Sequence, residues 1–245
     1  MENLKTVFLD IETAPNLGWV WGKWEQNVLD MKSDWYILSY GYKWAHEKKV
    51  ITRGLIDFPE YQKDKENDYK LVKELWDILN EADIVVAHNG DAFDLPKINT
   101  RFISHGLTPP APYKTVDTLK IARKNFAFDS NKLDDLGRYL GIGRKLPHTG
   151  FHLWKGCMIG DPESWRVMKK YNGHDVELLE ELYYLVRAWD KKHPHVNQGQ
   201  AEVCPKCGSD NVQRRGFNFT LLSKKQRYQC RDCAGWFEGG AKRVK

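Results

Sequence analysis

Residues 5–13 read KTVFLDIET, a run of apolar and β-branched residues that ends in two acids. Such residues favour extended backbone, so the run predicts a β-strand. Asp10 and Glu12 are two residues apart, and side chains at that spacing leave a strand on the same face. Two carboxylates that face together repel each other unless a cation lies between them. Mg²⁺ and Mn²⁺ prefer oxygen ligands, so this pair predicts a divalent-cation site.

Two further clusters of polar residues lie downstream. Residues 89–94 read NGDAFD and follow a short apolar strand expected over residues 82–87. A helix is expected over residues 95–105, so Asp94 is either the N-cap of that helix or a third acid of the site. Residues 171–175 read YNGHD. On a helix, the first and last of these side chains share a face, unless Asn172-Gly173 kinks the helix. Taken alone, Tyr171 is equally consistent with simple core packing.

In order and spacing, FLDIET, N-x-x-x-F-D and Y-x-x-x-D resemble the three exonuclease motifs of the DEDDy 3′→5′ exonucleases. Within that family they are most similar to the proofreading domains of family B DNA polymerases. The resemblance covers residues 5–190 and implies a ribonuclease-H-like fold. The sister DEDDh group has histidine where this chain has Lys170, so the tyrosine branch fits better. The resemblance implies metal-ligand roles for four acids: Asp10, Glu12, Asp94 and Asp175.

The implied reaction is metal-dependent hydrolysis of phosphodiester bonds. Two Mg²⁺ or Mn²⁺ ions about 3.5–4 Å apart activate the attacking water and stabilise the departing 3′-oxygen in such sites. Tyr171 would orient the water, since a free phenol with a pKa near 10 is a poor base at neutral pH. The family also grips the terminal nucleotide next to its first two motifs. The corresponding candidates for substrate binding here are Thr13, Asn16, Leu17, Asn89 and Phe93.

The rest of the chain predicts an α/β fold, a ribonuclease-H-like mixed sheet flanked by helices. Further strands are expected over residues 36–43, 49–55 and 114–117. Helices are expected over residues 68–81, 132–141 and 161–189, the last of them opened by an Asp-Pro start signal. A Trp-rich connection joins the first two strands, and no internal repeat is visible.

Four of the five cysteines form two C-x-x-C pairs, Cys204/Cys207 and Cys230/Cys233. This spacing is typical of a closed tetrahedral site for one structural Zn²⁺, with iron as a minor alternative. The surrounding residues resemble the zinc ribbons of some transposases and transcription factors. We therefore expect a nuclease domain over residues 1–190, a linker over 191–203 and a zinc ribbon over 204–245. So small a module depends on its metal for folding.

Positive charge is concentrated at the C-terminus. Residues 194–245 hold ten Lys and Arg against four Asp and Glu, a net charge of +6. The remaining residues carry a net charge of −1. Basic side chains interleaved with aromatic ones suit nucleic acid, although zinc ribbons also bind proteins. The candidate phosphate contacts in the ribbon are Arg214, Arg215, Lys224, Lys225 and Arg227.

Composition excludes several classes of protein. No stretch approaches the ~20 apolar residues of a membrane span, and the N-terminus has no signal-peptide pattern. A hydrophobic content of 41% argues against a disordered chain. Paired cysteines of this kind belong to a reducing compartment. We expect a cytoplasmic protein, nucleoid-associated, or a nuclear one in a eukaryote.

The motifs together predict a 3′→5′ exonuclease that acts on single-stranded DNA by a two-metal mechanism. An RNA 3′-trimming exoribonuclease is the first alternative, since this plan of acids serves both sugars. A non-catalytic nucleic-acid-binding adaptor on a nuclease scaffold is the second, and retention of all four acids argues against it. A transposase core would lack the second and third motifs. A polymerase or repair complex is the expected protein partner.

Overall fold

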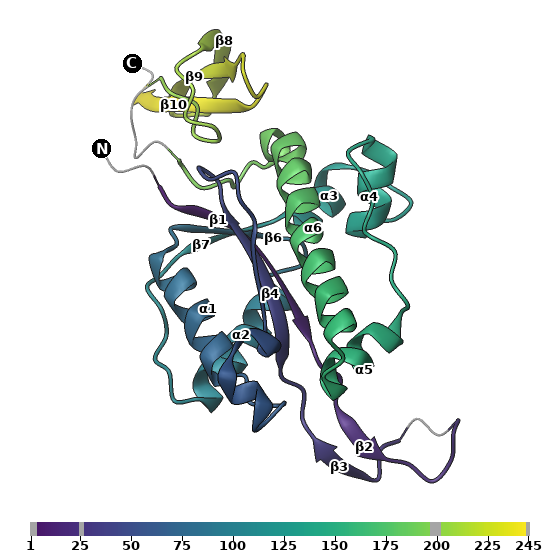
Figure 1. Cartoon of the computed structure of the whole chain (residues 1–245). Helices are drawn as coiled ribbons and strands as arrows, with labels where there is room; N and C mark the ends of the chain where they lie inside the picture. The colour runs from purple at the N-terminus through teal and green to yellow at the C-terminus, as the bar shows by residue number, and fades with distance from the viewer. Residues whose placement is uncertain (1–3, 25–26, 197–201, 244–245) are drawn as a thin grey trace.

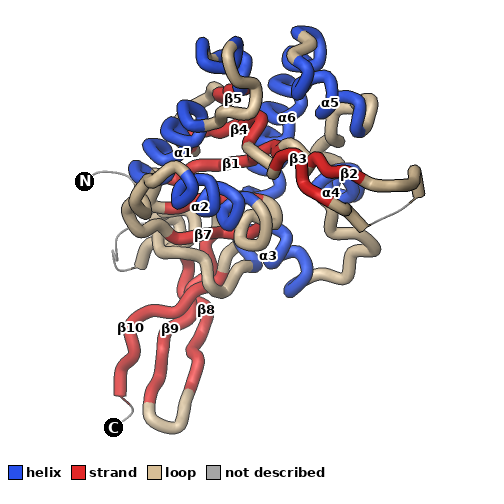
Figure 2. The backbone as a smooth tube through the Cα atoms, turned by 90° about the horizontal axis from the view of Figure 1, so that it is seen from below, coloured by secondary structure: helices blue, strands red, loops and turns tan. Residues whose placement is uncertain are grey.

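The structure is a computed structural model that describes residues 4–24, 27–196 and 202–243. The described residues form three sheets: a central one flanked by helices, a small C-terminal one, and a two-stranded hairpin (Figures 1 and 2). The hairpin projects from the end of the central domain that lies away from the small sheet (Figure 1). Among the described residues, no helix has the length and apolar character needed to span a membrane.

The central sheet has five strands in the order β5-β4-β1-β6-β7. Strand β1 (Thr6–Thr13) pairs antiparallel with β4 (Ile37–Trp44), and β4 pairs antiparallel with β5 (Ile51–Gly54). On its other side, β1 is parallel to β6 (Ile84–Ala87), which is parallel to β7 (Lys114–Asp117). All five strands were expected, and the mixed sheet confirms the predicted fold class.

Alternation along β1 sends its side chains into two hydrophobic layers. Val7, Leu9 and Ile11 pack with helices α1 (Tyr69–Glu81) and α2 (Asp94–Ser104). Phe8, on the opposite face, packs with helices α3 (Thr118–Asn125), α4 (Leu133–Leu140) and α6 (Pro162–Val186). Because side chains two apart share a face, Asp10 and Glu12 lie on the side of the sheet that α6 covers.

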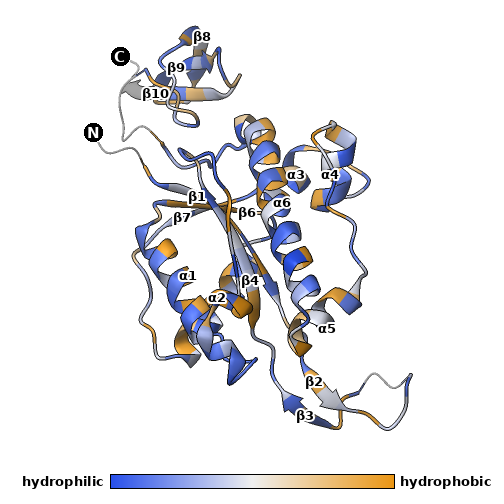
Figure 3. Ribbon diagram, in the orientation of Figure 1, coloured by the Kyte–Doolittle hydropathy of each residue, from blue (hydrophilic) through white to orange (hydrophobic). Residues whose placement is uncertain are grey.

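Helix α6 begins as expected, with the Asp161 side chain accepting a hydrogen bond from the Ser164 amide and proline at the next position. Orange hydrophobic patches alternate with blue hydrophilic ones along it, as expected for a helix with one face on a sheet (Figure 3). It crosses β4 closely at Gly41, where a Cβ atom would lie 3.0 Å from the Asn172 carbonyl oxygen. Glycine thus lets the helix approach the sheet.

Several short elements were not expected from the sequence. Helix α5 (Phe151–Ile159) precedes α6, and α3 begins at an N-cap formed by Asp117. The Trp-rich connection contains a hairpin of strands β2 (Leu17–Trp19) and β3 (Asp30–Ser33). Three 3₁₀ helices complete the domain, over Leu55–Asp57, Pro59–Gln62 and Arg187–Trp189.

The C-terminal sheet has three antiparallel strands in the order β10-β9-β8. They are β8 (Val212–Phe219), β9 (Ser223–Cys230) and β10 (Trp236–Arg243). The Lys206 ammonium donates to the Ala188 carbonyl oxygen, so the ribbon contacts the end of the central domain. The part of the linker over residues 197–201 lies outside the described residues.

A buried ionic network ties α1, α2 and β4 together. The Asp68 side chain is fully buried and accepts from the Ile37 amide at 2.9 Å. It also accepts two hydrogen bonds from the Arg101 guanidinium at 2.7 and 2.5 Å, and contacts His105 Nε2 at 2.6 Å. One carboxylate therefore satisfies donors from two elements that are distant in the sequence.

Asp68→Ala removes this carboxylate and leaves the Arg101 charge without its buried partner. Breaking a buried ion pair from one side costs about 3–5 kcal/mol of unfolding free energy. We expect that loss in urea denaturation followed by circular dichroism. Asp77→Ala is the control, since it removes an exposed i,i+4 pair with Lys73 worth at most about 0.5 kcal/mol. Equal losses for both variants would show that the network contributes no special stability.

Candidate active site

Strand β1 and helix α6 bring three acids together. Asp10 and Glu12 are half-buried on β1, and Asp175 is fully buried on α6. One carboxylate oxygen from each lies within 4.8 Å of the others. Alternation along the strand places Asp10 and Glu12 on one face, and the helix adds Asp175, which is 163 positions after Glu12 in the sequence.

Asp94 lies beside this group but is not one of the three mutually close acids. It is buried at the first residue of α2, and its Oδ1 accepts a hydrogen bond from the Ile11 amide at 3.1 Å. Among the neighbouring charges, Asp94 contributes most to the raised pKa of Asp10. It therefore faces the site electrostatically while one of its oxygens is held by the backbone of β1.

Tyr171 precedes Asp175 by one turn, and α6 runs continuously through both residues. Its hydroxyl accepts a hydrogen bond from the Lys145 ammonium at 2.9 Å. Edge-on contacts with His148 and Trp154 fix the ring, at centroid distances of 4.9 and 6.3 Å. Burial raises the pKa of Tyr171, so the phenol keeps its proton at neutral pH.

Sequence reasoning missed Lys145, which lies in the connection between α4 and α5. Its ammonium donates to Asp175 Oδ2 at 2.6 Å as well as to Tyr171. The connection is anchored by Asp134, whose carboxylate accepts from the Lys145 amide at 2.8 Å and from the Arg144 guanidinium at 3.2 Å. No local sequence pattern around Lys145 predicts this role, because the role depends on how the connection folds back over α6.

Asn172 was also missed. Its side-chain amide donates to Asp10 Oδ2 at 2.6 Å and to the Asp10 carbonyl oxygen at 3.3 Å. The side-chain oxygen of Asn172, Oδ1, accepts a hydrogen bond from the Ser39 hydroxyl at 3.3 Å. A fully buried asparagine thus fixes the first acid to α6. The available signal was its position next to Tyr171 in the third motif.

The acids carry more negative charge than their surroundings offset. Burial is the largest cause of the raised pKa of Asp10, followed by repulsion from Asp94, Glu12 and Asp175. Burial likewise raises the pKa of Glu12 to about 8 and that of Asp94 to about 7. The Lys145 ammonium opposes these shifts but does not cancel them.

The donor set fits a divalent cation. Asp175 Oδ1 is buried and has no hydrogen-bond partner among the described residues. Asp175 belongs to the group of three acids that each place one oxygen within 4.8 Å of the others. Hard oxygen donors, an unsatisfied buried oxygen and excess negative charge are together the environment that Mg²⁺ or Mn²⁺ stabilises. The acidic group can therefore bind metal.

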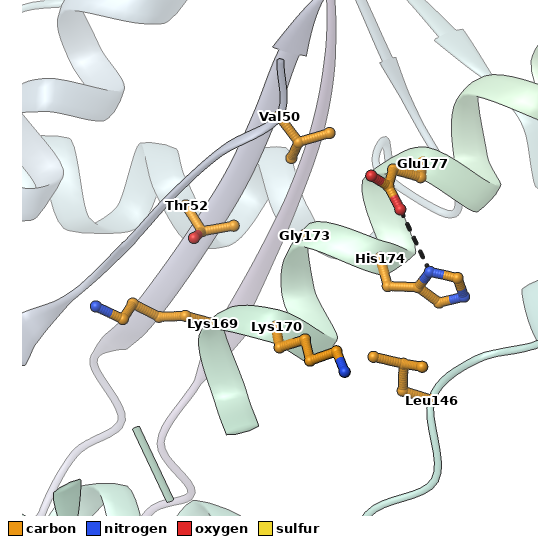
Figure 4. A pocket seen from close by; sticks show the side chains of 8 residues that line it. All are labelled: Val50, Thr52, Leu146, Lys169, Lys170, Gly173, His174 and Glu177. Atoms are coloured by element: carbon orange, nitrogen blue, oxygen red, sulfur yellow. Dashed lines mark ion pairs between the residues drawn. The ribbon is translucent and has the colours of Figure 1, made fainter. Parts of the chain in front are cut away.

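Lys170, at the position that distinguishes the two branches of DEDD exonucleases, is on the outer side of α6. It lines a pocket of about 330 Å³ with Thr52, Leu146 and His174 (Figure 4), and none of the three acids lines this pocket. Its ammonium points toward Leu146 in that view. The lysine thus occupies the outer pocket, and Tyr171 is the residue of this turn that contacts Lys145.

Two hollows adjoin the acids. One, of about 610 Å³, is lined by Asp10, His88, Asn89 and the basic side chains of Arg123, Lys132 and Lys145. The other, of about 390 Å³, is lined by Thr13 at the end of β1, by Asn16 after it, and by Trp35, Lys97 and Trp154. Leu17 begins β2, and Phe93 is 40% exposed at the start of α2. Of the candidate substrate contacts of this domain, Thr13, Asn16 and Asn89 thus line these two hollows, and Leu17 and Phe93 line neither.

The four paired cysteines meet at one end of the C-terminal sheet. Their Sγ atoms all lie within 4.8 Å of one another, with Cys204–Cys233 and Cys207–Cys230 each at 3.6 Å. Two C-x-x-C turns that converge in this way form a four-cysteine cluster suited to zinc. The remaining cysteine, Cys157, is buried in the central domain.

The basic candidates of the ribbon differ in their surroundings. Arg214 pairs with Glu202 at 2.8 Å, and Lys225 pairs with Glu238 at 3.2 Å. The Lys224 ammonium lies 3.8 Å from the ring centroid of Phe217. Arg215 contacts Gln229, and Arg227 lies near Gly216. An aromatic surface with neighbouring cations is thus present on the ribbon.

The fold and the acid cluster define a ribonuclease-H-like domain. Residues 7–187 match the model of the RNase H superfamily, and the chain belongs to this superfamily. Its sequence is similar to two archaeal DNA polymerases. That of Thermococcus aggregans is 33% identical over 109 residues, and that of Thermococcus litoralis is 32% identical over 102 residues. These matches cover 44% and 41% of this chain but 5% of each polymerase.

Among solved structures, the family B DNA polymerase from the hyperthermophilic archaeon Pyrobaculum calidifontis has a similar fold. The TM-score is 0.55 at 16% sequence identity, over 76% of this chain and 26% of that chain. The chain is thus an RNase H superfamily domain that resembles the exonuclease region of family B DNA polymerases, followed by a four-cysteine cluster. The resemblance expected from the motifs is confirmed.

Proposed function

We propose that the protein is a metal-dependent 3′→5′ exonuclease that hydrolyses single-stranded DNA. The observation that carries this proposal is the cluster of Asp10, Glu12 and Asp175, with Asp94 beside it and one buried oxygen unsatisfied. The similarity to archaeal DNA polymerases supports nucleic acid as the substrate. We also propose the division into a nuclease domain over 1–190, a linker over 191–203 and a zinc ribbon over 204–245.

In this proposal the four acids hold two Mg²⁺ or Mn²⁺ ions. Bound divalent cations lower the pKa of water and offset charge on the phosphate and the departing 3′-oxygen. Asn172 keeps the Asp10 carboxylate in place through its 2.6 Å hydrogen bond. Tyr171, protonated and held by neighbouring rings, orients the attacking water by hydrogen bonding. The Lys145 ammonium offsets part of the negative charge of the acids and positions the phenol.

The ribbon contributes binding in this proposal. One Zn²⁺ on the four cysteines stabilises the turns of the small sheet. Arg215, Lys224 and Arg227 are then available for phosphates, with Phe217 and Phe219 for bases. Arg214 and Lys225 must first exchange their glutamate partners for phosphate. Cysteine ligands must stay reduced to hold zinc, so we propose a reducing compartment, the cytoplasm or, in a eukaryote, the nucleus.

Product analysis tests the proposed reaction. Single-stranded DNA and RNA of matched sequence are incubated with Mg²⁺ or Mn²⁺, and the products are separated by chromatography. We expect nucleoside 5′-monophosphates as the only early products, with DNA consumed faster. Faster consumption of RNA would favour the exoribonuclease instead. Internal fragments would contradict exonuclease action, and binding without any products would favour an adaptor.

Lys145→Met tests whether the acid cluster binds a divalent cation. The ammonium is the counter-ion of Asp175 in this structure, so its removal leaves repulsion among the carboxylates that added metal can relieve. We expect Mn²⁺ to raise the melting temperature of this variant by at least about 3 °C more than that of the parent. This shift corresponds to ~1 kcal/mol of additional unfolding free energy. Lys170→Met, on the outer side of α6, is the control. Equal rises in all three proteins would contradict the assignment.

A further inference from the structure

The hairpin of β2 and β3 carries several large apolar side chains that are exposed to solvent. We define the Trp arm as residues 17–24 and 27–33. Trp19, Trp21 and Trp24 on this arm are 62%, 87% and 85% exposed. Val28, Leu29 and Met31 of the same arm are also exposed. Clustered apolar groups of this size on a soluble surface mark a binding site, because leaving them in water costs free energy.

The arm is continuous with the candidate active site. Its first strand begins five residues after Glu12, and its base is fixed by two hydrogen bonds. The Ala14 amide donates to the Tyr36 carbonyl oxygen at 2.9 Å, and the Trp35 amide donates to Asn16 Oδ1 at 2.8 Å. The arm thus has an anchored base, and β2 and β3 project from the lower end of the domain in Figure 1.

Aromatic side chains line the pocket at the base of the arm. The pocket of about 390 Å³ at the base of the arm is lined by Trp35, Phe151 and Trp154. Burial raises the pKa of Glu12, and the neighbouring Trp154 side chain opposes that rise. The Lys97 ammonium lies 3.8 Å from the ring centroid of Trp35, and Lys23 lies 5.2 Å from that of Trp24. Flat rings with adjacent cations are therefore present both at the base of the arm and on the arm itself.

Single-stranded nucleic acid is the ligand that this arrangement fits. Unpaired bases present successive flat faces, and each stacks on an aromatic side chain without regard to sequence. In the sequence over residues 17–33, Lys23 and Lys32 are balanced by Glu25 and Asp30, so the net charge is zero. Attraction for phosphates is therefore small, and stacking must supply the affinity. A protein partner could also cover the indoles. Nucleic acid is favoured because the arm directly follows the strand that carries Asp10 and Glu12, the acids proposed to act on a nucleic-acid strand.

We propose that the Trp arm is a second nucleic-acid-binding site, which holds unpaired bases upstream of the 3′ end by stacking on Trp21 and Trp24. This proposal rests on the proposed function. It divides binding between two surfaces of different physical character. The arm binds by stacking and is insensitive to salt, whereas the basic ribbon binds phosphates and weakens as salt rises. A strand that reaches both surfaces gains affinity from each.

The test compares the parent with the double variant Trp21→Ala, Trp24→Ala. Binding of a fluorescent single-stranded oligonucleotide of about ten nucleotides or more is followed by anisotropy without Mg²⁺ or Mn²⁺. We expect the double variant to bind about 10- to 100-fold more weakly. We also expect the slope of log affinity against log salt to stay as in the parent. Replacement by phenylalanine should restore much of the affinity, since a ring is retained.

Ile103→Ala is the matched control, because Ile103 is 78% exposed on α2 outside the arm. Lys224→Ala in the ribbon is the contrasting variant, and we expect it to flatten the salt slope. Unchanged affinity in the double Trp variant would overturn the arm proposal, as would a loss equal to that of Ile103→Ala. A parent that binds the strand yet yields no products with Mg²⁺ or Mn²⁺ would sink the proposed function and leave the arm proposal standing.

Discussion

Asp10→Asn combined with Asp175→Asn lowers the rate of phosphodiester hydrolysis by at least about 10³-fold. This expectation follows because loss of one group that stabilises transition-state charge already costs about 10²–10³ in rate, and here two metal-binding carboxylates are lost together. An amide keeps the shape of each side chain and one acceptor oxygen, so Asn172 can still donate to residue 10. The measurement is the initial rate of nucleotide release with saturating Mg²⁺.

Asp77→Asn serves as the control, since its carboxylate is exposed on α1 and pairs with Lys73. Circular dichroism and the melting temperature of the double variant should show a folded protein, because removing buried like charges relieves repulsion. A folded double variant with near-normal activity would rule out the acid cluster as the site of hydrolysis.

Cys204→Ser combined with Cys233→Ser abolishes zinc binding and unfolds the ribbon. The four Sγ atoms are close enough to share one ion, and structural zinc contributes about 10–16 kcal/mol in small modules at neutral pH. We expect metal analysis to fall from about one zinc per chain, as for a closed four-cysteine site, to none. Affinity for long strands should fall with it, more at low salt than at high salt.

Cys157→Ala is the control for this variant, since it removes a buried thiol of the central domain and leaves the four-cysteine cluster intact. Iron in place of zinc in the parent would contradict the metal assignment. Full zinc content in the double variant would show that other residues hold the ion.

The elements that position the acids were predictable because their signals are local. Alternation along β1 places Asp10 and Glu12 on one face from sequence alone. The Asp161-Pro162 start of α6 was confirmed, and the i,i+4 spacing of Tyr171 and Asp175 follows from the helix. The paired cysteines likewise carry their ligand spacing in the sequence. Each of these features needs only a few neighbouring residues to define it.

The rest of the site depends on packing between distant segments. Lys145 reaches Asp175 because the connection after α4 folds back onto α6, and no pattern within that connection specifies this path. The sequence around Asn172 predicts only a helical residue. Its contact with Asp10 arises because α6 packs over β1. The hairpin of β2 and β3 was missed because its strands are short and largely exposed, so they lack the alternation of a half-buried strand.

The central claim is that the acid cluster removes nucleotides from a 3′ end with divalent cations. The most direct test follows a 5′-labelled single strand on a denaturing gel, with and without added Mg²⁺ or Mn²⁺. The account predicts a ladder that shortens one nucleotide at a time, requires the added cation and is absent in Asp10→Asn. Cleavage that persists in Asp10→Asn, or release of the 5′ label as a mononucleotide at the earliest times, would contradict it.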